Sequence, residues 1–96
     1  ADAGWDYEIN GITIDVKTAH KPHYRLIFRE LSAFKSQVAV LVVKISEDVF
    51  RIKGWVSKKN FANWAELMDD DGFALPNNRL RKIQNLWLNT AIKGLK

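Results

Sequence analysis

Two aspartates and a lysine near the start of the chain have the residue types and spacing of a metal-dependent site. Asp6 precedes the dipeptide Asn10-Gly11, and Asp15 and Lys17 follow it, separated from each other by one residue. Carboxylate oxygens are natural ligands of Mg²⁺. A neighbouring ammonium can donate a proton or stabilise negative charge that develops during a reaction. The three side chains therefore suit a bound divalent cation with a cationic group beside it.

A β-hairpin is the element that must position these residues. Asn10-Gly11 is the strongest short signal for a two-residue type I′ turn, because both central residues of that turn need positive φ. A turn at this place makes Asp6 face Asp15 across the two strands. The apolar side chains then share the opposite face of the hairpin, and they are Trp5, Tyr7, Ile9, Ile12, Ile14 and Val16.

The facing aspartates are unusual in a sequence shaped for stability alone. The Asp6–Asp15 pair is predicted at a non-hydrogen-bonded position, where opposed Cα atoms lie only about 4.5 Å apart and like charges destabilise the sheet. A divalent cation would turn this repulsion into attraction. Two other interpretations stay open. One is a solvent-exposed hairpin edge with a weak surface pair between Asp15 and Lys17, and the other is a raised pKa on one carboxylate.

The order Asp, short hairpin, then (Asp/Glu)-x-Lys on the second strand resembles the PD-(D/E)XK nuclease superfamily. The pattern reads Gly4-Trp5-Asp6 before the turn and Ile14-Asp15-Val16-Lys17-Thr18 after it. The segments 38–43 and 51–61 also look like those of small phage-type or restriction/homing-type members, so the resemblance covers residues 5–61. It implies a restriction-endonuclease-like mixed β-sheet that starts with a hairpin and is flanked by helices.

The resemblance also implies an activity and a role for each residue. Asp6, Asp15 and the backbone carbonyl of Val16 would bind Mg²⁺ or Mn²⁺, and Lys17 would position or activate the attacking water. The implied protein is an endonuclease that hydrolyses DNA phosphodiester bonds by in-line displacement. A homodimer is expected, because cleavage of both DNA strands needs two sites.

The sequence departs from the family pattern at three points. Trp5 stands where the family has proline, and Asp15 stands where Glu is more usual, which shortens the reach of the ligand. The family core begins with a helix that packs on the sheet, whereas five residues precede Asp6. We expect that helix in a segment before residue 1, in a partner chain, or missing from an abbreviated fold.

Further strands are predicted after the hairpin, in one α/β or α+β domain that spans residues 1–96. Residues 38–44 are apolar and β-branched almost throughout, as expected of a central strand that is buried on both faces. Other strands are predicted at 24–28 and 49–56. A short helix is predicted at 30–36.

Two helices are predicted in the last third of the chain. Ser57 is the expected N-cap of a helix at about 58–68. Asn77 or Asn78 is the expected cap of a second helix at about 79–93. Apolar residues recur at helical spacing in both segments, and they are Phe61, Trp64, Ala65 and Met68 in the first and Leu80, Ile83, Trp87 and Ala91 in the second.

Length and composition set wide limits. A chain of 96 residues suits one domain, and the absence of cysteine excludes disulfides, iron–sulfur sites and thiol nucleophiles. The net charge of +4 is compatible with an anionic partner such as nucleic acid without requiring one. The longest apolar run, 38–43, is too short to cross a bilayer, and no signal-peptide pattern is visible. We therefore expect a cytoplasmic protein with no membrane partner.

Five basic residues are candidates for contacts with DNA phosphates, and they are Lys21, His23, Arg79, Arg81 and Lys82. The first two lie in the loop after the hairpin, which is otherwise interpreted as a solvated loop. The last three open the final predicted helix, where positive charge opposes the helix dipole. An exposed basic turn is the alternative there. Trp55 shares its predicted strand face with Arg51 and Lys53 and is the best candidate for base stacking.

Weaker metal motifs and other functions remain as alternatives. His20 and His23 have H-x-x-H spacing, but Pro22 disfavours a helix there and no third zinc ligand is evident. Asp69-Asp70-Asp71-Gly72 lacks the alternate ligand spacing of a calcium loop and is interpreted as a hydrated loop that ends a helix. For the whole chain, the alternatives to a nuclease are a non-catalytic nucleic-acid-binding or assembly module with the same fold, and a structural domain.

Overall fold

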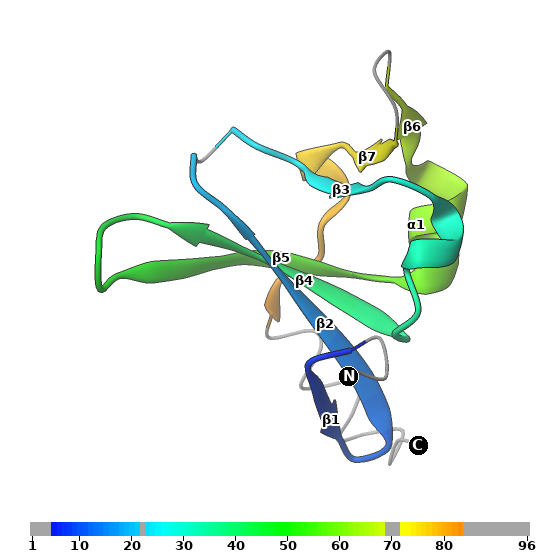
Figure 1. Ribbon diagram of the computed structural model, residues 1–96, viewed down its shortest axis with the longest axis horizontal. Helices are drawn as coiled ribbons and strands as arrows, with labels where there is room; N and C mark the ends of the chain where they lie inside the picture. Colours follow the sequence, from blue (N-terminus) through cyan, green and yellow to red (C-terminus); the bar gives the residue numbers. More distant parts are fainter. Residues whose placement is uncertain (1–4, 22, 69–71, 84–96) are drawn as a thin grey trace.

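Two β-sheets and one α-helix make up the described part of the chain, which is a mixed α+β fold (Figure 1). The computed structural model describes residues 5–21, 23–68 and 72–83. No helix in these ranges is long and apolar enough to cross a lipid bilayer. The elements in chain order are β1 (Tyr7–Ile9), β2 (Ile12–Ala19), β3 (Leu26–Phe28), the 3₁₀ helix η1 (Leu31–Ala33), β4 (Val38–Lys44), β5 (Phe50–Ser57), α1 (Lys58–Trp64), β6 (Glu66–Leu67), β7 (Phe73–Leu75) and the 3₁₀ helix η2 (Asn77–Arg79).

The larger sheet has four strands in the order β1-β2-β4-β5. β1 and β2 are antiparallel, as are β4 and β5, whereas β2 and β4 run parallel. A parallel pair needs a crossover connection. Here the crossover is the segment 20–37, which contributes β3 to a second sheet of order β3-β7-β6. This smaller sheet covers one face of the larger one (Figure 1).

The Asn10-Gly11 turn has the predicted conformation. Both residues have positive φ, 51° at Asn10 and 83° at Gly11. β1 and β2 pair in the predicted register, with Tyr7 opposite Ile14. Because side chains alternate along a strand, this register directs Ile12, Ile14 and Val16 to one face of the sheet and Asp15 to the other.

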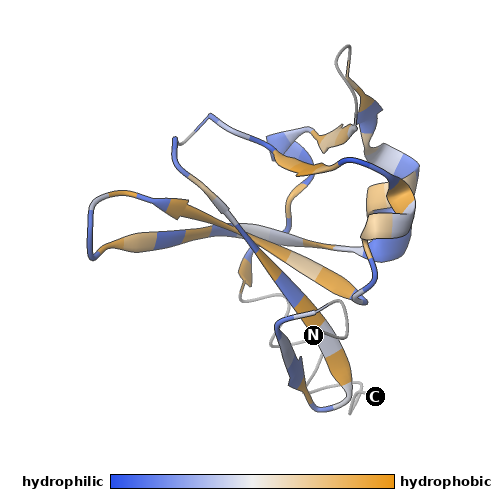
Figure 2. Cartoon of the chain, viewed as in Figure 1, coloured by the Kyte–Doolittle hydropathy of each residue, from blue (hydrophilic) through white to orange (hydrophobic). Residues whose placement is uncertain are grey.

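β4 is the central strand that its sequence predicts, and it has the predicted bounds. Val38 and Val40 belong to the core on one face of the sheet, and Ala39, Leu41 and Val43 belong to the core on the other. Figure 2 shows hydrophobic colouring along much of this strand. A strand that is paired on both edges and covered on both faces has no polar side to present, which explains its unbroken apolar sequence.

The core between the two sheets is built around three aromatic rings. Phe28 stacks on Phe34 with ring centroids 4.6 Å apart, and Phe61 meets Phe28 edge-on at 5.2 Å. Phe61 is supplied by α1, which begins at the predicted cap. The Ser57 hydroxyl oxygen accepts a hydrogen bond of 3.2 Å from the Asn60 N–H. These rings hold the small sheet and α1 against the large sheet.

The helix predicted at 58–68 is too long. α1 ends at Trp64, and the chain then forms β6, in which Leu67 pairs with Phe73 of β7. The apolar spacing of this segment is compatible with a helix, but pairing with β7 satisfies its backbone groups in the small sheet instead. The short helix predicted at 30–36 is reduced to η1. The other predicted strands keep their type and shift only at their ends.

The opposite face of the large sheet packs against the segment that follows η2. Its buried core is formed by Ile14, Val38, Val40 and Trp55, with Ile83 packed beside them. Trp55 and Arg81 exchange two backbone hydrogen bonds of 2.9 and 2.8 Å. Gly54 permits this close approach, since a Cβ there would lie 2.7 Å from the Arg81 carbonyl oxygen.

The second predicted helix does not begin at residue 79. Arg79 ends η2, and Arg81 lies in an extended bridge to β5, so Arg79, Arg81 and Lys82 do not form the first turn of a helix. The backbone hydrogen bonds to Trp55 hold this segment extended. The part of the predicted helix at 84–93 lies outside the described residues.

Candidate functional site

One hairpin brings together the three residues that the sequence predicts to act together. Asp15 and Lys17 project from the face of β2 that also carries Ala19, a member of the core between the sheets. Asp6 lies directly before β1. Asp15 and Lys17 therefore lie at the margin of that core, and Asp6 is exposed beside them.

Asp6 is anchored by two hydrogen bonds to the backbone of β2. Its N–H donates to the Ile14 carbonyl at 2.9 Å, and its Oδ2 accepts from the Val16 N–H at 2.8 Å. The strand ladder stops at the pair of Tyr7 and Ile14, so the direct cross-strand pairing predicted for Asp6 and Asp15 is not formed. The Asp6 N–H binds the carbonyl of Ile14, which is already paired with Tyr7, so Asp6 lies outside the regular ladder. The Asp6 carboxylate then accepts the hydrogen bond from the Val16 N–H of β2.

The carboxyl group of Asp15 is the most perturbed titratable group of the hairpin. Its side chain is only 17% exposed. Burial is the largest cause that raises its pKa above the usual 3.8, and a hydrogen bond with the Asp6 side chain raises it further. The Lys17 ammonium opposes this rise, and the negative charge of Asp6 adds to it. A nearby divalent cation would favour the ionised form.

The Lys17 ammonium lies between Asp15 and an aromatic ring. Its Nζ is 3.7 Å from Asp15 Oδ2 and 4.9 Å from the centroid of the Phe28 ring. The face of an aromatic ring attracts a cation. The side chain remains 44% exposed. The site therefore offers a positioned cation that a ligand in solvent can reach.

The oxygen donors of the hairpin fit a hydrated Mg²⁺ or Mn²⁺ ion. Mg²⁺ keeps several waters and is usually held by one or two carboxylates, which Asp6 and Asp15 can supply. The Val16 N–H points toward Asp6, and the carbonyl of a strand residue points to the same side as its N–H. The Val16 carbonyl oxygen therefore points to the side of β2 on which Asp6 lies. Over residues 5–21, 23–68 and 72–83, no group of three or more His, Cys, Asp or Glu side chains is placed to hold a metal.

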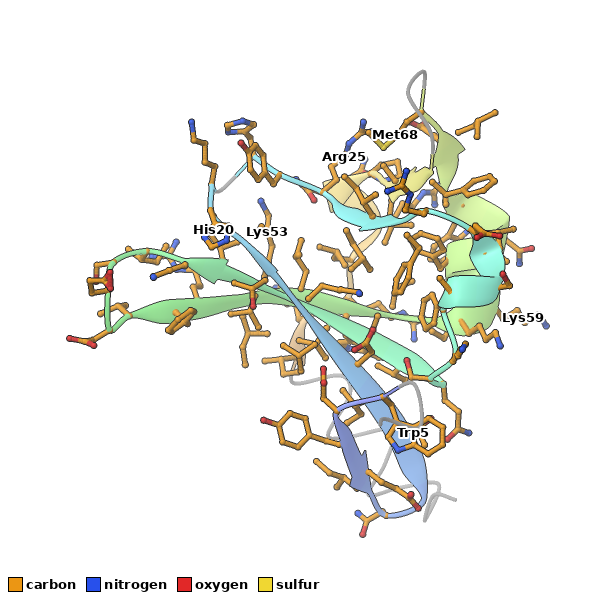
Figure 3. All side chains as sticks on the ribbon, viewed as in Figure 1. Trp5, His20, Arg25, Lys53, Lys59 and Met68 are labelled. Carbon is orange, nitrogen blue, oxygen red and sulfur yellow. The ribbon has the colours of Figure 1, made fainter. Side chains whose placement is uncertain are left out.

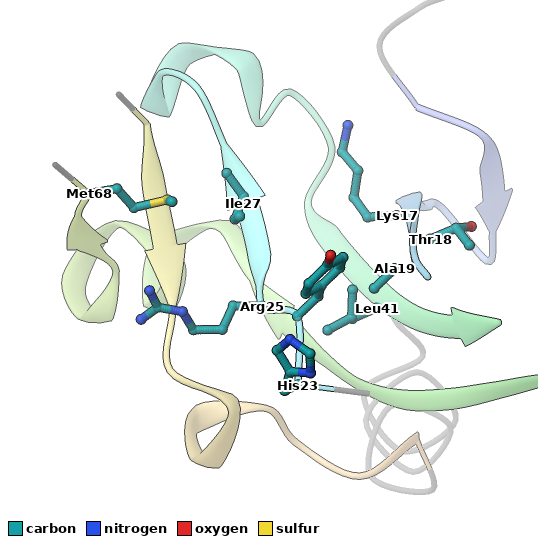
Figure 4. A pocket seen from close by; sticks show the side chains of 9 residues that line it. Lys17, Thr18, Ala19, His23, Arg25, Ile27, Leu41 and Met68 are labelled. Carbon is teal, nitrogen blue, oxygen red and sulfur yellow. The ribbon is translucent and has the colours of Figure 1, made fainter. Parts of the chain in front are cut away.

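A cavity of about 500 Å³ opens beside Lys17 (Figure 4). β2 contributes Lys17 to its lining, the crossover contributes His23 and Arg25, and Met68 follows β6. Figure 3 shows Arg25 and Met68 at the same end of the molecule. Of the two loop residues predicted to contact DNA, His23 therefore shares a cavity with Lys17. Lys21 is exposed in the loop before it.

Sequence reasoning missed Tyr24 and Arg25, which also line this cavity. The Arg25 guanidinium lies 3.4 Å from the Glu66 carboxylate, and Tyr24 is 43% exposed. Their own neighbourhood in the sequence does not mark them as site residues. The wall to which they belong forms only when β3 pairs with β7, a strand that is distant in the sequence. Their position next to His23 was the one available signal.

Arg79 at the end of η2 and the two basic residues that follow it, Arg81 and Lys82, are not among the residues that line the cavity. Arg79 lies 5.0 Å from the ring centroid of Trp64, and Arg81 lies 5.6 Å from that of Trp55. The Trp55 indole N–H donates to the Lys82 carbonyl at 2.9 Å, and Trp55 is only 4% exposed. The prediction that Trp55 stacks on bases is therefore wrong. A register shift in the pairing of β4 with β5 changes the side-chain alternation and turns Trp55 into the core.

The weaker metal motifs add no site to the described chain. His20 and His23 have no third histidine, cysteine or acidic ligand grouped with them in the part of the chain that the structure describes. Asp69, Asp70 and Asp71 lie outside the described residues.

Comparisons with known proteins give no relative for this chain. No protein-family model matches it. No curated protein sequence and no solved structure matches it either. Its function must therefore be inferred from the site itself.

Proposed function

We propose that the chain is a metal-dependent endonuclease of the PD-(D/E)XK type, which hydrolyses phosphodiester bonds in DNA. The observation that carries the proposal is the hairpin cluster, in which Asp15 interacts with both the Asp6 carboxyl group and the Lys17 ammonium. A merely hydrated hairpin edge would leave Asp15 exposed, whereas its side chain is 17% exposed. Burying an acid beside another acid lowers stability. A function that requires a divalent cation accounts for this arrangement.

The arrangement of the large sheet supports the same family. The sheet starts with the antiparallel hairpin of β1 and β2, and β2 then pairs in parallel with the central strand β4. The resemblance implies a mixed sheet of this kind, with the acids and the lysine on its first hairpin.

Each residue has a defined task in the proposed reaction. A bound Mg²⁺ or Mn²⁺ ion would polarise a phosphoryl oxygen and lower the pKa of a bound water. Asp6 and Asp15 would hold this ion through their carboxylate oxygens. Lys17 would bind the phosphate and stabilise the additional negative charge that develops on it during attack by water. Asp15 orients the ammonium through their 3.7 Å contact.

Nicking of supercoiled plasmid DNA in Mg²⁺ or Mn²⁺ tests the proposal. Lys17→Ala should lower the nicking rate by about 100-fold or more, as expected for the loss of a group that transfers a proton or stabilises charge. Lys44→Ala is a matched control, because its ammonium also lies 3.7 Å from a carboxylate, that of Glu47. This variant should nick DNA at the rate of the unaltered chain.

Metal-dependent nicking that is lost in Lys17→Ala and kept in Lys44→Ala supports the nuclease. Nicking that continues in EDTA, or that survives in Lys17→Ala, contradicts it. DNA binding with no nicking by the unaltered chain favours the non-catalytic module instead.

A further inference from the structure

The cavity beside Lys17 has the size and position of a ligand pocket for the same site. Its volume of about 500 Å³ falls within the range of pockets that enclose small organic ligands. Lys17 belongs both to the lining of the cavity and to the cluster with Asp15. A group bound in the cavity would therefore lie next to any phosphate that Lys17 contacts.

The lining of the cavity is largely apolar and aromatic. Leu41 belongs to the large sheet, Ile27 belongs to β3 of the smaller sheet, and Met68 directly follows β6 (Figure 4). Tyr24 is 43% exposed, and its ring meets the His23 ring edge-on with centroids 4.9 Å apart. An exposed aromatic ring beside aliphatic walls provides a surface on which a nucleobase can stack.

The charged groups in the lining are positive. Lys17 and Arg25 contribute cations, and no aspartate or glutamate is among the described residues that line the cavity. Arg25 is paired with Glu66 at 3.4 Å, but the two side chains are 39% and 64% exposed. An ion pair this exposed is weak, so a phosphate can compete for the guanidinium. The cavity thus offers an apolar interior with cations at its margin, which matches a base joined to its phosphate.

We propose that this cavity receives one unpaired nucleotide of the DNA strand whose phosphate lies at Lys17. The inference rests on the proposed nuclease function and specifies its substrate class as single-stranded or locally unpaired DNA. A base inside a duplex is stacked on both faces and bonded to its partner along its edge. It must leave the stack before it can enter a cavity of this kind.

DNA binding in EDTA tests this inference without cleavage. The probes are a fluorescent oligothymidylate and a labelled duplex of the same length, and anisotropy gives their affinities. We expect the single strand to bind at least about fivefold more tightly than the duplex. Tyr24→Ala should weaken single-strand binding by about tenfold, within the range for one base stacked on an aromatic ring.

Two further variants make the result specific. Phe50→Ala removes an aromatic ring on β5 that is more exposed than Tyr24, 53% against 43%, and is not among the cavity residues, so it should leave both affinities unchanged. Ile27→Glu places an acid in the lining at a position that is 41% exposed, where it should not disturb folding. It should weaken single-strand binding by repelling the phosphate.

The binding and nicking assays can fail separately. Equal affinity for single strand and duplex, or equal losses in Tyr24→Ala and Phe50→Ala, overturns the nucleotide pocket even if nicking depends on Lys17. A preference for single strands that Tyr24→Ala removes supports the pocket even if the chain does not nick DNA. The absence of nicking in that case would overturn the proposed nuclease activity and leave the nucleotide pocket standing.

Discussion

The lysine–carboxylate pairs on β2 and at the end of β4 are the same contact in two environments. Lys17 lies 3.7 Å from Asp15, and Lys44 lies 3.7 Å from Glu47. The Glu47 side chain is 87% exposed, whereas that of Asp15 is 17% exposed. Asp15 also has the carboxyl group of Asp6 as a neighbour.

The difference shows that the ion pair is not what marks a site in this molecule. An exposed pair such as Lys44–Glu47 contributes about 0–1 kcal/mol and needs no functional explanation. At Asp15 the surroundings act against the ionised acid, because burial and a second acid both raise its pKa. A group whose charged form is disfavoured by its own fold is a better indicator of a binding site than a favourable contact.

The largest expected difference between the two pairs is in catalysis. Asp15→Asn removes a charged metal ligand and should reduce metal-dependent nicking by about 100-fold or more. Glu47→Gln alters an acid at the same distance from a lysine and should leave the rate unchanged. Plasmid nicking at fixed Mg²⁺ measures both variants. A similar rate for the two would remove the distinction between the pairs.

Metal binding should separate the pairs by a smaller amount. A cation that binds only the folded chain stabilises it by about 1.4 kcal/mol at ten times its Kd. We expect Mg²⁺ to raise the midpoint of thermal unfolding for the unaltered chain and for Glu47→Gln, with a much smaller rise for Asp15→Asn. Equal rises in all three proteins would place the cation elsewhere.

The smallest expected effect is on the stability of the metal-free chain. Asp15→Asn should raise the free energy of unfolding by about 0.5–1 kcal/mol at neutral pH, because it removes a charge that burial and the neighbouring Asp6 carboxylate disfavour. The raised pKa of Asp15 gives this gain a pH dependence. Below the usual value of 3.8 the acid is protonated in both the folded and unfolded chains, and the variant has no advantage from this charge.

As the pH rises above that value, the unfolded chain releases the Asp15 proton first, so the unaltered protein loses stability until the folded carboxyl group has also ionised. The difference between the two proteins should therefore grow with pH through this window and then become constant. Urea unfolding in EDTA at several pH values measures it. A difference that shrinks with rising pH would mean that the pKa of Asp15 is lowered, not raised.

The local part of the fold could be predicted from the sequence, and the hairpin is the best example. Asn10-Gly11 determines the turn and the register, because positive φ at both residues is a local requirement. β4 could be predicted equally well, because burial on both faces requires apolar residues over 38–43. The register predicts Asp6 directly opposite Asp15, but the ladder ends at Tyr7 and Ile14, and the two carboxyl groups interact with Asp6 outside the ladder.

The non-local part could not be predicted in the same way. The small sheet depends on the long-range pairing of β3 with β7, and β6 joins it by pairing with β7 where the helical spacing up to Met68 predicts a helix. The irregular pairing of β5 with β4 reversed the expected exposure of Trp55. The cavity residues Tyr24 and Arg25 depend on this same long-range packing.

Because β2 pairs in parallel with β4, the acidic hairpin and the cavity wall form at different stages of folding. The β1–β2 hairpin closes across a two-residue turn, and such hairpins form in about 1–10 μs. The crossover 20–37 must be closed before β2 and β4 can pair, and non-local closure of this kind is the slow part of folding. Asp6 and Asp15 can thus be brought together early, whereas the wall that holds Tyr24 is completed late. Substitutions in the crossover will therefore alter the folding rate and the cavity together. The contact between Asp6 and Asp15 depends on the local hairpin and should not change with them.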